Sequence, residues 1–277
     1  MTAIEWTDKT WNPVTGCTKV SQGCKHCYAE SIVKRFGGDF TKVRWHEGRL
    51  NQPKQWGRPQ RIFVNSMSDM FHEDIPDEFI ERVLLTIKNT PEHDYQILTK
   101  RPLRMERFMA EHYMAGADFL DNLWLGVSVE NRETANRIAL LRMTEAAVKF
   151  ISFEPLLEDM KEVCLEGIDW AIVGGESGYP SRKMETDWAR RILQQCRKFG
   201  TAFFMKQMGT KGDVLPVYSV NDSDTKMRRT RKGNDLREIP EDLRIREMPT
   251  QYLDKIFMSK QIIEQTPEPT NQQETML

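Results

Sequence analysis

The sequence predicts an α/β fold, a partial (β/α)6-type TIM barrel of parallel strands followed by a polar C-terminal extension. Two observations predict it. From residue 61 onward, short apolar runs alternate with helical patterns, which is typical of βαβ units around a parallel sheet. Each apolar run also ends in polar or small residues, and the carboxyl ends of parallel strands carry the active site in such folds. A chain of 277 residues is long enough to form this barrel as one unit.

The expected strands and helices follow one another regularly. The predicted strands are the apolar runs at 61–66, 95–100, 123–130, 148–155, 170–177 and 201–209. The predicted helices span about 29–36, 77–89, 131–143 and 187–200, and Gly200 ends the last of them. With one more strand before the first cysteine, these elements make six or seven repeats. A closed barrel has eight, so an open doubly wound sheet is the alternative.

Composition and charge exclude several classes of protein. Hydrophobic residues make up 39% and charged residues 29% of the chain, which argues against wholesale disorder. The net charge of −1 provides no global attraction to nucleic acid or anionic lipid. No apolar run is long enough to span a membrane and the N-terminus lacks a signal-peptide pattern, so we expect a cytoplasmic protein with no membrane contact. We expect the barrel to span 1–210 and the extension 211–277, with a disordered tail from about 264.

Three of the five cysteines lie close together, at Cys17, Cys24 and Cys27. They have the spacing C-x6-C-x2-C, in a loop containing Gly and Ser between a predicted strand and a predicted helix. Soft thiolates suit iron–sulfur clusters and zinc, and three ligands leave one coordination position open. The alternative is a structural zinc ion with His26 or His46 as the fourth ligand. The other two cysteines, Cys164 and Cys196, are expected to be buried structural thiols.

Several segments resemble a known superfamily. They are CTKVSQGCKHCYAE, FVNSMSDMFHEDIP, ILTKRP, GVSVEN, FISFEPLL and IVGGESG. The cysteine loop followed by βα repeats resembles the radical S-adenosylmethionine (SAM) superfamily, although the usual spacing there is C-x3-C-x2-C. More closely, residues 4 to 210 resemble the phage and prophage three-cysteine-motif proteins. The resemblance implies a [4Fe–4S] cluster on the three cysteines, SAM bound at the open iron, and an external electron donor.

The resemblance also implies contacts to SAM. Ser66, Ser68 and Asp69 follow the 61–66 strand in a pattern similar to that of the spore photoproduct lyase group. There Asp69 is the candidate contact to the SAM ammonium group. The alternative is that Ser68 or Asp69 only caps a turn or helix.

Further polar residues at strand ends are candidates for the same cofactor. They are Ser128, Glu130 and Glu154. Either glutamate is placed to accept hydrogen bonds from the SAM ribose, or instead to form an ion pair with Arg132 or Lys100. The segment 174–178, GGESG, is expected to line the substrate or cofactor cavity, or to form a tight turn.

The substrate does not follow from the residues. The basic stretch 226–232 is suited to a phosphate backbone or to solvent. Through the phage resemblance alone, the expected substrate is a nucleic acid or nucleotide, and a partner protein is a further candidate. The rival functions are a zinc-stabilised nucleic-acid-binding protein and, more weakly, a metal-free barrel enzyme acting on a sugar phosphate. No residue is assigned a catalytic role.

Overall fold

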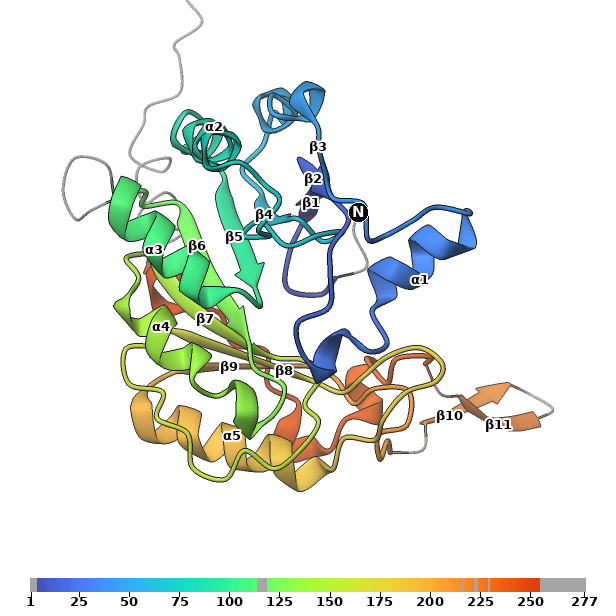
Figure 1. Cartoon of the computed structure of the whole chain (residues 1–277). Helices are drawn as coiled ribbons and strands as arrows, with labels where there is room; N and C mark the ends of the chain where they lie inside the picture. Colours follow the sequence, from blue (N-terminus) through green and yellow to red (C-terminus); the bar gives the residue numbers. More distant parts are fainter. Residues whose placement is uncertain (1–3, 114–118, 216, 222–223, 229, 255–277) are drawn as a thin grey trace, which may run out of the picture.

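Seven parallel strands form one curled sheet, as the sequence predicts (Figure 1). The computed structural model describes residues 4–113, 119–215, 217–221, 224–228 and 230–254, and only the backbone of 217–221 and 224–228. The sheet has the order β1-β4-β5-β6-β7-β8-β9, and each neighbouring pair is parallel. The strands are β1 (Lys9–Trp11), β4 (Arg61–Val64), β5 (Asp94–Thr99), β6 (Leu123–Ser128), β7 (Val148–Phe153), β8 (Trp170–Gly174) and β9 (Ala202–Gln207). The sheet ends at β1 and β9, so the architecture is a partial barrel.

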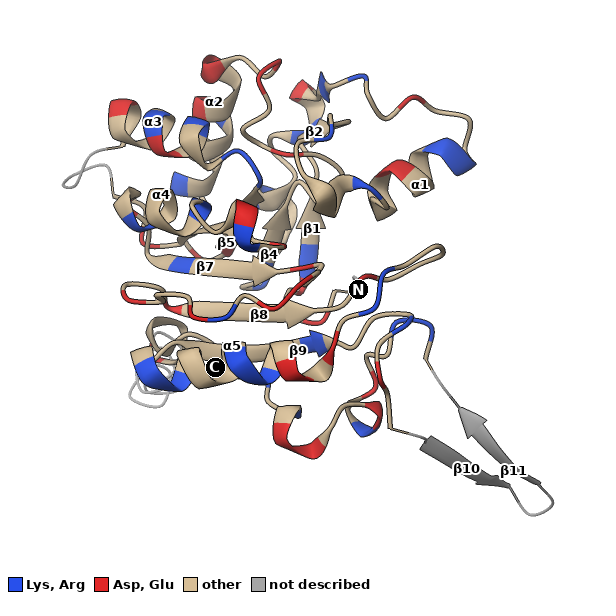
Figure 2. Cartoon of the chain, turned by 60° about the horizontal axis from the view of Figure 1, so that its bottom comes forward, with Lys and Arg blue, Asp and Glu red and all other residues tan. Residues whose placement is uncertain are grey.

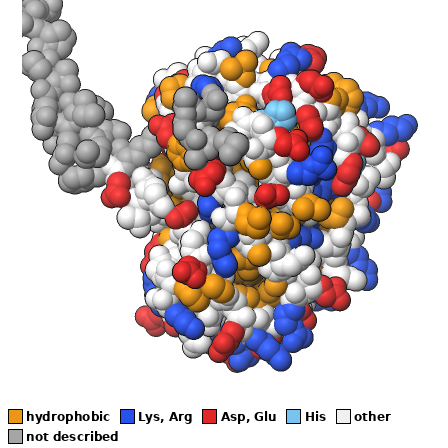
Figure 3. All heavy atoms as spheres, turned by 60° about the vertical axis from the view of Figure 1, so that its left-hand side comes forward, with side chains coloured by type: hydrophobic (Ala, Val, Ile, Leu, Met, Phe, Trp, Pro, Cys, Tyr) orange, Lys and Arg blue, Asp and Glu red, His pale blue; other side chains and the backbone are white. Residues whose placement is uncertain are grey.

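Helices follow most of the strands and cover the outer face of the sheet (Figures 1 and 2). The helices that cover the sheet are α2 (Asp77–Lys88), α3 (Pro102–His112), α4 (Arg137–Met143) and α5 (Thr186–Phe199), whereas α1 (Tyr28–Arg35) lies apart from them and follows the cysteine loop. Their outward surface mixes Lys, Arg, Asp and Glu with scattered apolar side chains (Figure 3). The buried apolar residues of α2 recur at helical spacing, as the sequence predicts. Helix α5 ends at Gly200, whose φ is 71°. No helix lies between β7 and β8 in the described chain.

One predicted helix begins later than expected. The region 131–143 starts with a 3-10 turn, Arg132–Thr134, and α4 begins only at Arg137. The side chains of Asn131 and Thr134 form a capping box with the backbone of that turn. These local hydrogen bonds favour the turn over a continuous helix.

Short elements complete the chain. The pairs β2 (Val14–Thr15) with β3 (Arg44–Trp45) and β10 (Val217–Asn221) with β11 (Asp224–Arg228) are antiparallel. The remaining 3-10 turns are Gln22–Cys24, Glu47–Arg49, Pro53–Gln55, Leu236–Glu238 and Glu241–Leu243. No described helix is both long and apolar enough to cross a membrane.

Aromatic side chains fill the inner face of the curled sheet. Trp6 packs edge-on against Phe63 with ring centroids 4.7 Å apart and against Trp170 at 6.1 Å. Phe150 fits because Gly126 on the neighbouring strand has no side chain; a Cβ there would lie 2.5 Å from the ring. A second, larger apolar cluster lies between the sheet and the helices. The inner cluster closes the interior of the partial barrel.

The described part of the C-terminal extension packs against the sheet. Residues 245–247 run antiparallel to β9: the Met205 N–H donates to the Ile245 carbonyl at 2.8 Å, and the Glu247 N–H to the Phe203 carbonyl at 2.9 Å. The Trp170 indole N–H donates to the Glu247 carbonyl at 2.9 Å. The tail predicted from about 264 lies outside the described residues, as does Arg229 of the basic stretch.

Candidate functional site

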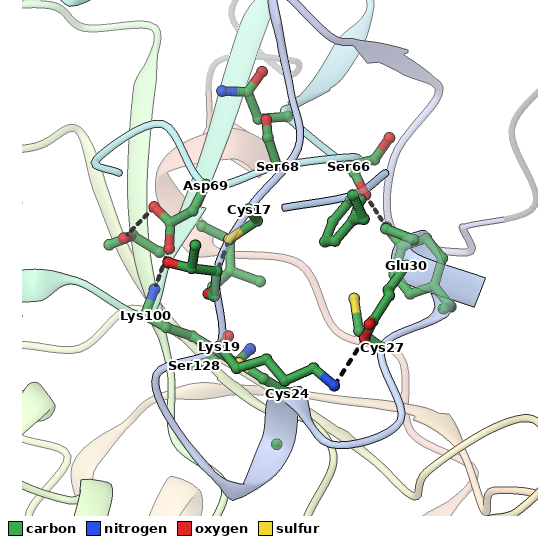
Figure 4. Close-up of a pocket in the computed structure, with 18 of the residues that line it drawn as sticks. Cys17, Lys19, Cys24, Cys27, Glu30, Ser66, Ser68, Asp69, Lys100 and Ser128 are labelled. Atoms are coloured by element: carbon green, nitrogen blue, oxygen red, sulfur yellow. Dashed lines mark hydrogen bonds and ion pairs between the residues drawn. The ribbon is translucent and has the colours of Figure 1, made fainter. Parts of the chain in front are cut away.

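The carboxyl ends of the strands border a cavity of about 420 Å³ that all three clustered cysteines line. We call it the cysteine cavity. One wall is the loop carrying Cys17, Cys24 and Cys27, and the other is formed by residues that follow β4, β5 and β6 (Figure 4). The predicted residues that line it are Cys17, Cys24, Cys27, Ser66, Ser68, Asp69 and Ser128. Residues predicted from distant parts of the sequence are therefore brought together.

Two glycines let the cysteine loop lie directly on its neighbours. Gly16 has a φ of 89°, and a Cβ there would lie 2.2 Å from the Lys42 carbonyl oxygen. A Cβ at Gly23 would lie 2.5 Å from the Glu130 side chain. Any larger residue at either position would push the loop away from the barrel.

Arg101 lies beside the first cysteine. Its Nη1 donates to Cys17 Sγ at 3.5 Å, and its Nη2 to Thr18 Oγ1 at 2.9 Å. Burial and the charge of Asp69 raise the pKa of the Cys17 thiol to about 11, although Arg101 opposes the shift. The free thiol is thus protonated at neutral pH and is a poor nucleophile, whereas a bound metal ion would displace its proton.

Asp69 has four hydrogen-bond donors around its carboxylate. Oδ1 accepts from Thr99 Oγ1 at 2.6 Å and from the Phe71 N–H at 3.0 Å. Oδ2 accepts from the Lys100 N–H at 2.9 Å and from Arg101 Nη1 at 3.3 Å. A carboxylate offers about four acceptor positions. A further donor such as an ammonium group would therefore have to replace one of these, and Arg101 is the most distant.

The two serines beside Asp69 have spare acceptor capacity. Ser66 Oγ donates to Asn12 Oδ1 at 3.1 Å, and Ser68 Oγ donates to the Val14 carbonyl at 2.9 Å. Each hydroxyl thus donates its one proton in a hydrogen bond, and the lone pairs of its oxygen can still accept another hydrogen bond.

Glu130 is fully buried and has several partners. Its Oε2 lies 3.1 Å from Arg137 Nη1, and its Oε1 accepts from Ser21 Oγ at 2.9 Å and lies 3.4 Å from Lys100 Nζ. Of the two ion-pair partners considered from the sequence, the structure selects Lys100; Arg132 forms a different ion pair on the surface. Glu130 therefore joins the barrel to the cysteine loop.

A second cavity, also of about 420 Å³, adjoins the first. We call it the strand-end cavity. Both cavities are lined by Gly23, Cys27, Tyr28, Lys100 and Ser128, among others. Ser128 itself is buried, and its carbonyl accepts from Arg137 Nη1 at 2.7 Å.

Glu154 lines the strand-end cavity. Its Oε1 lies 2.8 Å from Lys206 Nζ, and its Oε2 accepts from Ser152 Oγ at 3.1 Å. A Cβ at Gly174 would lie 2.6 Å from the same carboxylate. Unlike Glu130, this side chain retains 13% of its surface exposed.

The GGESG segment also reaches this cavity, through Glu176. Arg182 Nε donates to Glu176 Oε2 at 3.0 Å, and His26 Nδ1 lies 3.0 Å from the same oxygen. Burial favours the neutral form of Glu176, but the hydrogen bonds from Arg182 and His26 outweigh it and lower the carboxyl pKa. Arg182 also donates to the Gln22 carbonyl at 3.0 Å. The segment thus gives the cysteine loop a second anchor besides Glu130.

The histidines of the zinc alternative are engaged elsewhere. His46 Nε2 lies 2.8 Å from Thr15 Oγ1, and His26 pairs with Glu176. Within the described ranges, no three His, Cys, Asp or Glu residues are arranged to hold a metal ion. Three free thiols around one cavity fit a cluster better, because each thiolate then binds a different iron atom. The donor set thus suits an iron–sulfur cluster.

Two arginines of the site were not predicted from the sequence, and one cysteine was predicted wrongly. The arginines are Arg137 and Arg182, which hold the two buried carboxylates; an arginine in the first turn of the helix after a strand-end glutamate was the available signal for Arg137. The prediction that Cys164 is buried is wrong, because it lies exposed in the loop before β8, whereas Cys196 is buried in α5 as predicted. Of the basic stretch, the side chains of 226–228 lie outside the described residues.

Comparisons with known proteins give one family and several similar solved structures. A family model described as "Protein of unknown function (DUF5131)" matches residues 1–268. No curated protein matches the chain. Spore photoproduct lyase complexed with dinucleoside spore photoproduct is similar with a TM-score of 0.43 at 14% identity, over 78% of this chain and 67% of that chain. A mutant of that lyase with bound AdoMet and the same dinucleoside has a TM-score of 0.44 at 14% identity, over 78% and 66%. The resemblance to phage three-cysteine-motif proteins stays a prediction.

Proposed function

The chain belongs to the DUF5131 family, and we propose that it is a radical SAM enzyme holding a [4Fe–4S] cluster on Cys17, Cys24 and Cys27. One observation carries the proposal. Three free thiols from a single loop line one cavity at the carboxyl ends of parallel strands. That arrangement leaves one iron of a cluster open to a small-molecule ligand.

When bound, the reduced cluster supplies one electron that cleaves SAM to methionine and a 5′-deoxyadenosyl radical. The residues of the chain orient the reactants and exclude water. Arg101 directs an N–H toward Cys17 Sγ, and hydrogen bonds to cluster sulfurs tune the potential. Glu130 and Glu176 hold the cysteine loop against the barrel through Ser21 and His26.

The cysteine cavity is the proposed place for the amino-acid end of SAM. Ser66 and Ser68 have free acceptor positions for an ammonium group, as their contacts above imply. Asp69 can join them only if the ammonium replaces Arg101 at its carboxylate.

The strand-end cavity is the proposed place for the ribose and the substrate. Glu154 is the better ribose contact of the two candidate glutamates, because it lines this cavity whereas Glu130 is wholly buried. Ser128 lies between the two cavities. An external electron donor, a cytoplasmic location and a nucleic acid or nucleotide substrate, with a partner protein where needed, complete the proposal.

Anaerobic reconstitution with iron and sulfide tests it. We expect about four iron atoms per chain, and 5′-deoxyadenosine after SAM and a reductant are added. The Cys24→Ala variant should lose the iron and the product. Cys164→Ala is the matched control, because Cys164 is exposed and outside the cavity. About one zinc ion per chain, with no iron or sulfide, would refute the proposal in favour of a zinc protein.

A further inference from the structure

The strand-end cavity contains a lysine, Lys232, that no carboxylate among the described residues neutralises. Of the two carboxylates that line the cavity, Glu154 is paired with Lys206 at 2.8 Å and Glu176 with Arg182. Lys232 also lines the cavity, and the described part of the chain provides no carboxylate within ion-pair distance of it. A cation left unpaired in a cavity favours an anionic ligand.

Lys100 adds to this positive charge. It lies 3.4 Å from Glu130, but that carboxylate is already paired with Arg137 at 3.1 Å. Two cations thus share one carboxylate, and Lys100 also lines the strand-end cavity. Around this cavity and its immediate partners, five Lys and Arg side chains stand against three glutamates, so the site has two positive charges in excess.

The backbone that carries Lys232 is fixed on the barrel. Its carbonyl accepts from the Gly209 N–H at 2.9 Å, and the Gly233 carbonyl accepts from the Met208 N–H at 2.8 Å. Gly233 has a φ of 63°, which favours glycine. Figure 2 shows Lys and Arg on the segments that meet near the end of β9. The C-terminal extension therefore delivers a positioned lysine to the cavity.

An apolar wall lies in the same cavity. Trp6, Phe63 and Leu98 line it from the sheet side. Tyr28 and Ile32, one turn apart on α1, line it from the other side and are 49% and 41% exposed. Exposed aromatic and aliphatic side chains beside cations are typical of sites that stack a planar base and hold its phosphate.

We propose that the strand-end cavity binds a nucleoside phosphate, with the phosphate on Lys232 and the base against the wall that includes Tyr28 and Ile32. As a statement about substrate, this rests on the proposed function. As a statement about binding, it depends only on the chain itself. A free mononucleotide and the 5′-phosphorylated end of a strand share this chemistry.

Calorimetric titration of the full chain tests the proposal. The probes are the four nucleoside 5′-monophosphates, the matched nucleosides, inorganic phosphate and a short 5′-phosphorylated oligonucleotide. Lys232→Gln is the informative variant, because changing Lys206 would leave Glu154 without its partner. We expect Lys232→Gln to weaken nucleotide binding about tenfold or more and to leave nucleoside binding unchanged. Lys211→Gln, an exposed lysine outside the cavity, should bind as the unchanged chain does.

The titrations distinguish a free nucleotide from a strand end, and they test the nucleotide site separately from the iron–sulfur cluster. Tighter binding of the oligonucleotide than of every mononucleotide would support the proposal and identify a strand end; the reverse would support it and identify a free nucleotide. Equal affinity for nucleoside and nucleotide, binding of inorganic phosphate alone, or unchanged binding in Lys232→Gln would overturn it. Iron measured on the same sample reports independently on the cluster, so either proposal can fail while the other stands.

Discussion

Helices α1 and α2 are held in place by different forces. α2 buries six of its twelve residues in the main core, whereas α1 buries only Ala29 of its eight. The contacts of α1 are mostly polar: Glu30 lies 3.0 Å from Lys19 in the cysteine loop and 2.7 Å from Lys34 in its own helix. Packing fixes α2, while α1 is tied to the loop that precedes it.

The difference in burial between α1 and α2 indicates that the α1 side of the strand-end cavity is suited to a ligand. The barrel needs no ligand to bury its apolar surface, because sheet and helices already cover each other. The α1 side chains that line the strand-end cavity have no such cover. Burial of this surface by a ligand would contribute free energy that the chain alone does not supply.

The largest expected effect comes from comparing a buried carboxylate of the barrel, Glu130 just after β6, with Glu30 on α1. Glu130→Ala should lower the free energy of unfolding by about 3–5 kcal/mol, because it leaves Arg137 buried without its counterion. Glu30→Ala on α1 should cost less than about 1 kcal/mol, because its lysine partners are exposed. Urea denaturation monitored by circular dichroism measures both. Equal losses would break the comparison.

A pair of isoleucines, one on each helix, tests the difference in packing between α2 and α1 without changing a charge. Ile80 on α2 is fully buried, and Ile80→Ala should cost about 2–5 kcal/mol through lost burial and the cavity left behind. Ile32 on α1 is 41% exposed, and Ile32→Ala should cost less than about 1 kcal/mol. The same denaturation experiment applies, and a loss at Ile32 as large as that at Ile80 would show that α1 is a core helix after all.

The smallest effect concerns pH and the anchor of the cysteine loop. Because the folded pKa of Glu176 lies below its ordinary value, its contacts stabilise the fold above the unfolded pKa and are lost as the pH falls through the folded pKa. The backbone N–H of Arg182, which donates to Glu176 Oε2 at 2.7 Å, should therefore lose exchange protection only when the pH falls below the ordinary pKa of a glutamate and reaches the lowered pKa of Glu176. Hydrogen exchange corrected for intrinsic rates measures this. Protection that does not change with pH, or Glu176→Gln behaving like the parent chain, would contradict it.

The fold was predictable because burial repeats along the chain. Each predicted strand from 61 onward overlaps one of β4 to β9, although β5 begins one residue early at Asp94, and buried positions of α2 such as Val83 follow the helical spacing. The start of α4 was not predictable, because the hydrogen bonds of Asn131 and Thr134 interrupt a segment whose apolar spacing is helical. Local side-chain chemistry there overrides the periodic signal.

The candidate site was predictable only where its residues are neighbours in sequence. The cysteines stand within one loop, so their spacing alone indicated a metal centre. The partners of the buried carboxylates depend on which helix or loop folds over which strand end. Arg182, for example, contacts Gln22 across 160 positions, and no pattern along the chain records that contact.

The outer edge of β9 has a consequence for how the molecules behave together. A strand at the end of a sheet displays unpaired N–H and C=O groups that can recruit a strand from another molecule. Here residues 245–247 occupy that side of β9 through the Met205–Ile245 and Phe203–Glu247 hydrogen bonds. The extension thus covers the edge strand. A chain shortened before residue 245 would expose the hydrogen-bonding groups of β9 to other molecules and should associate with them more readily.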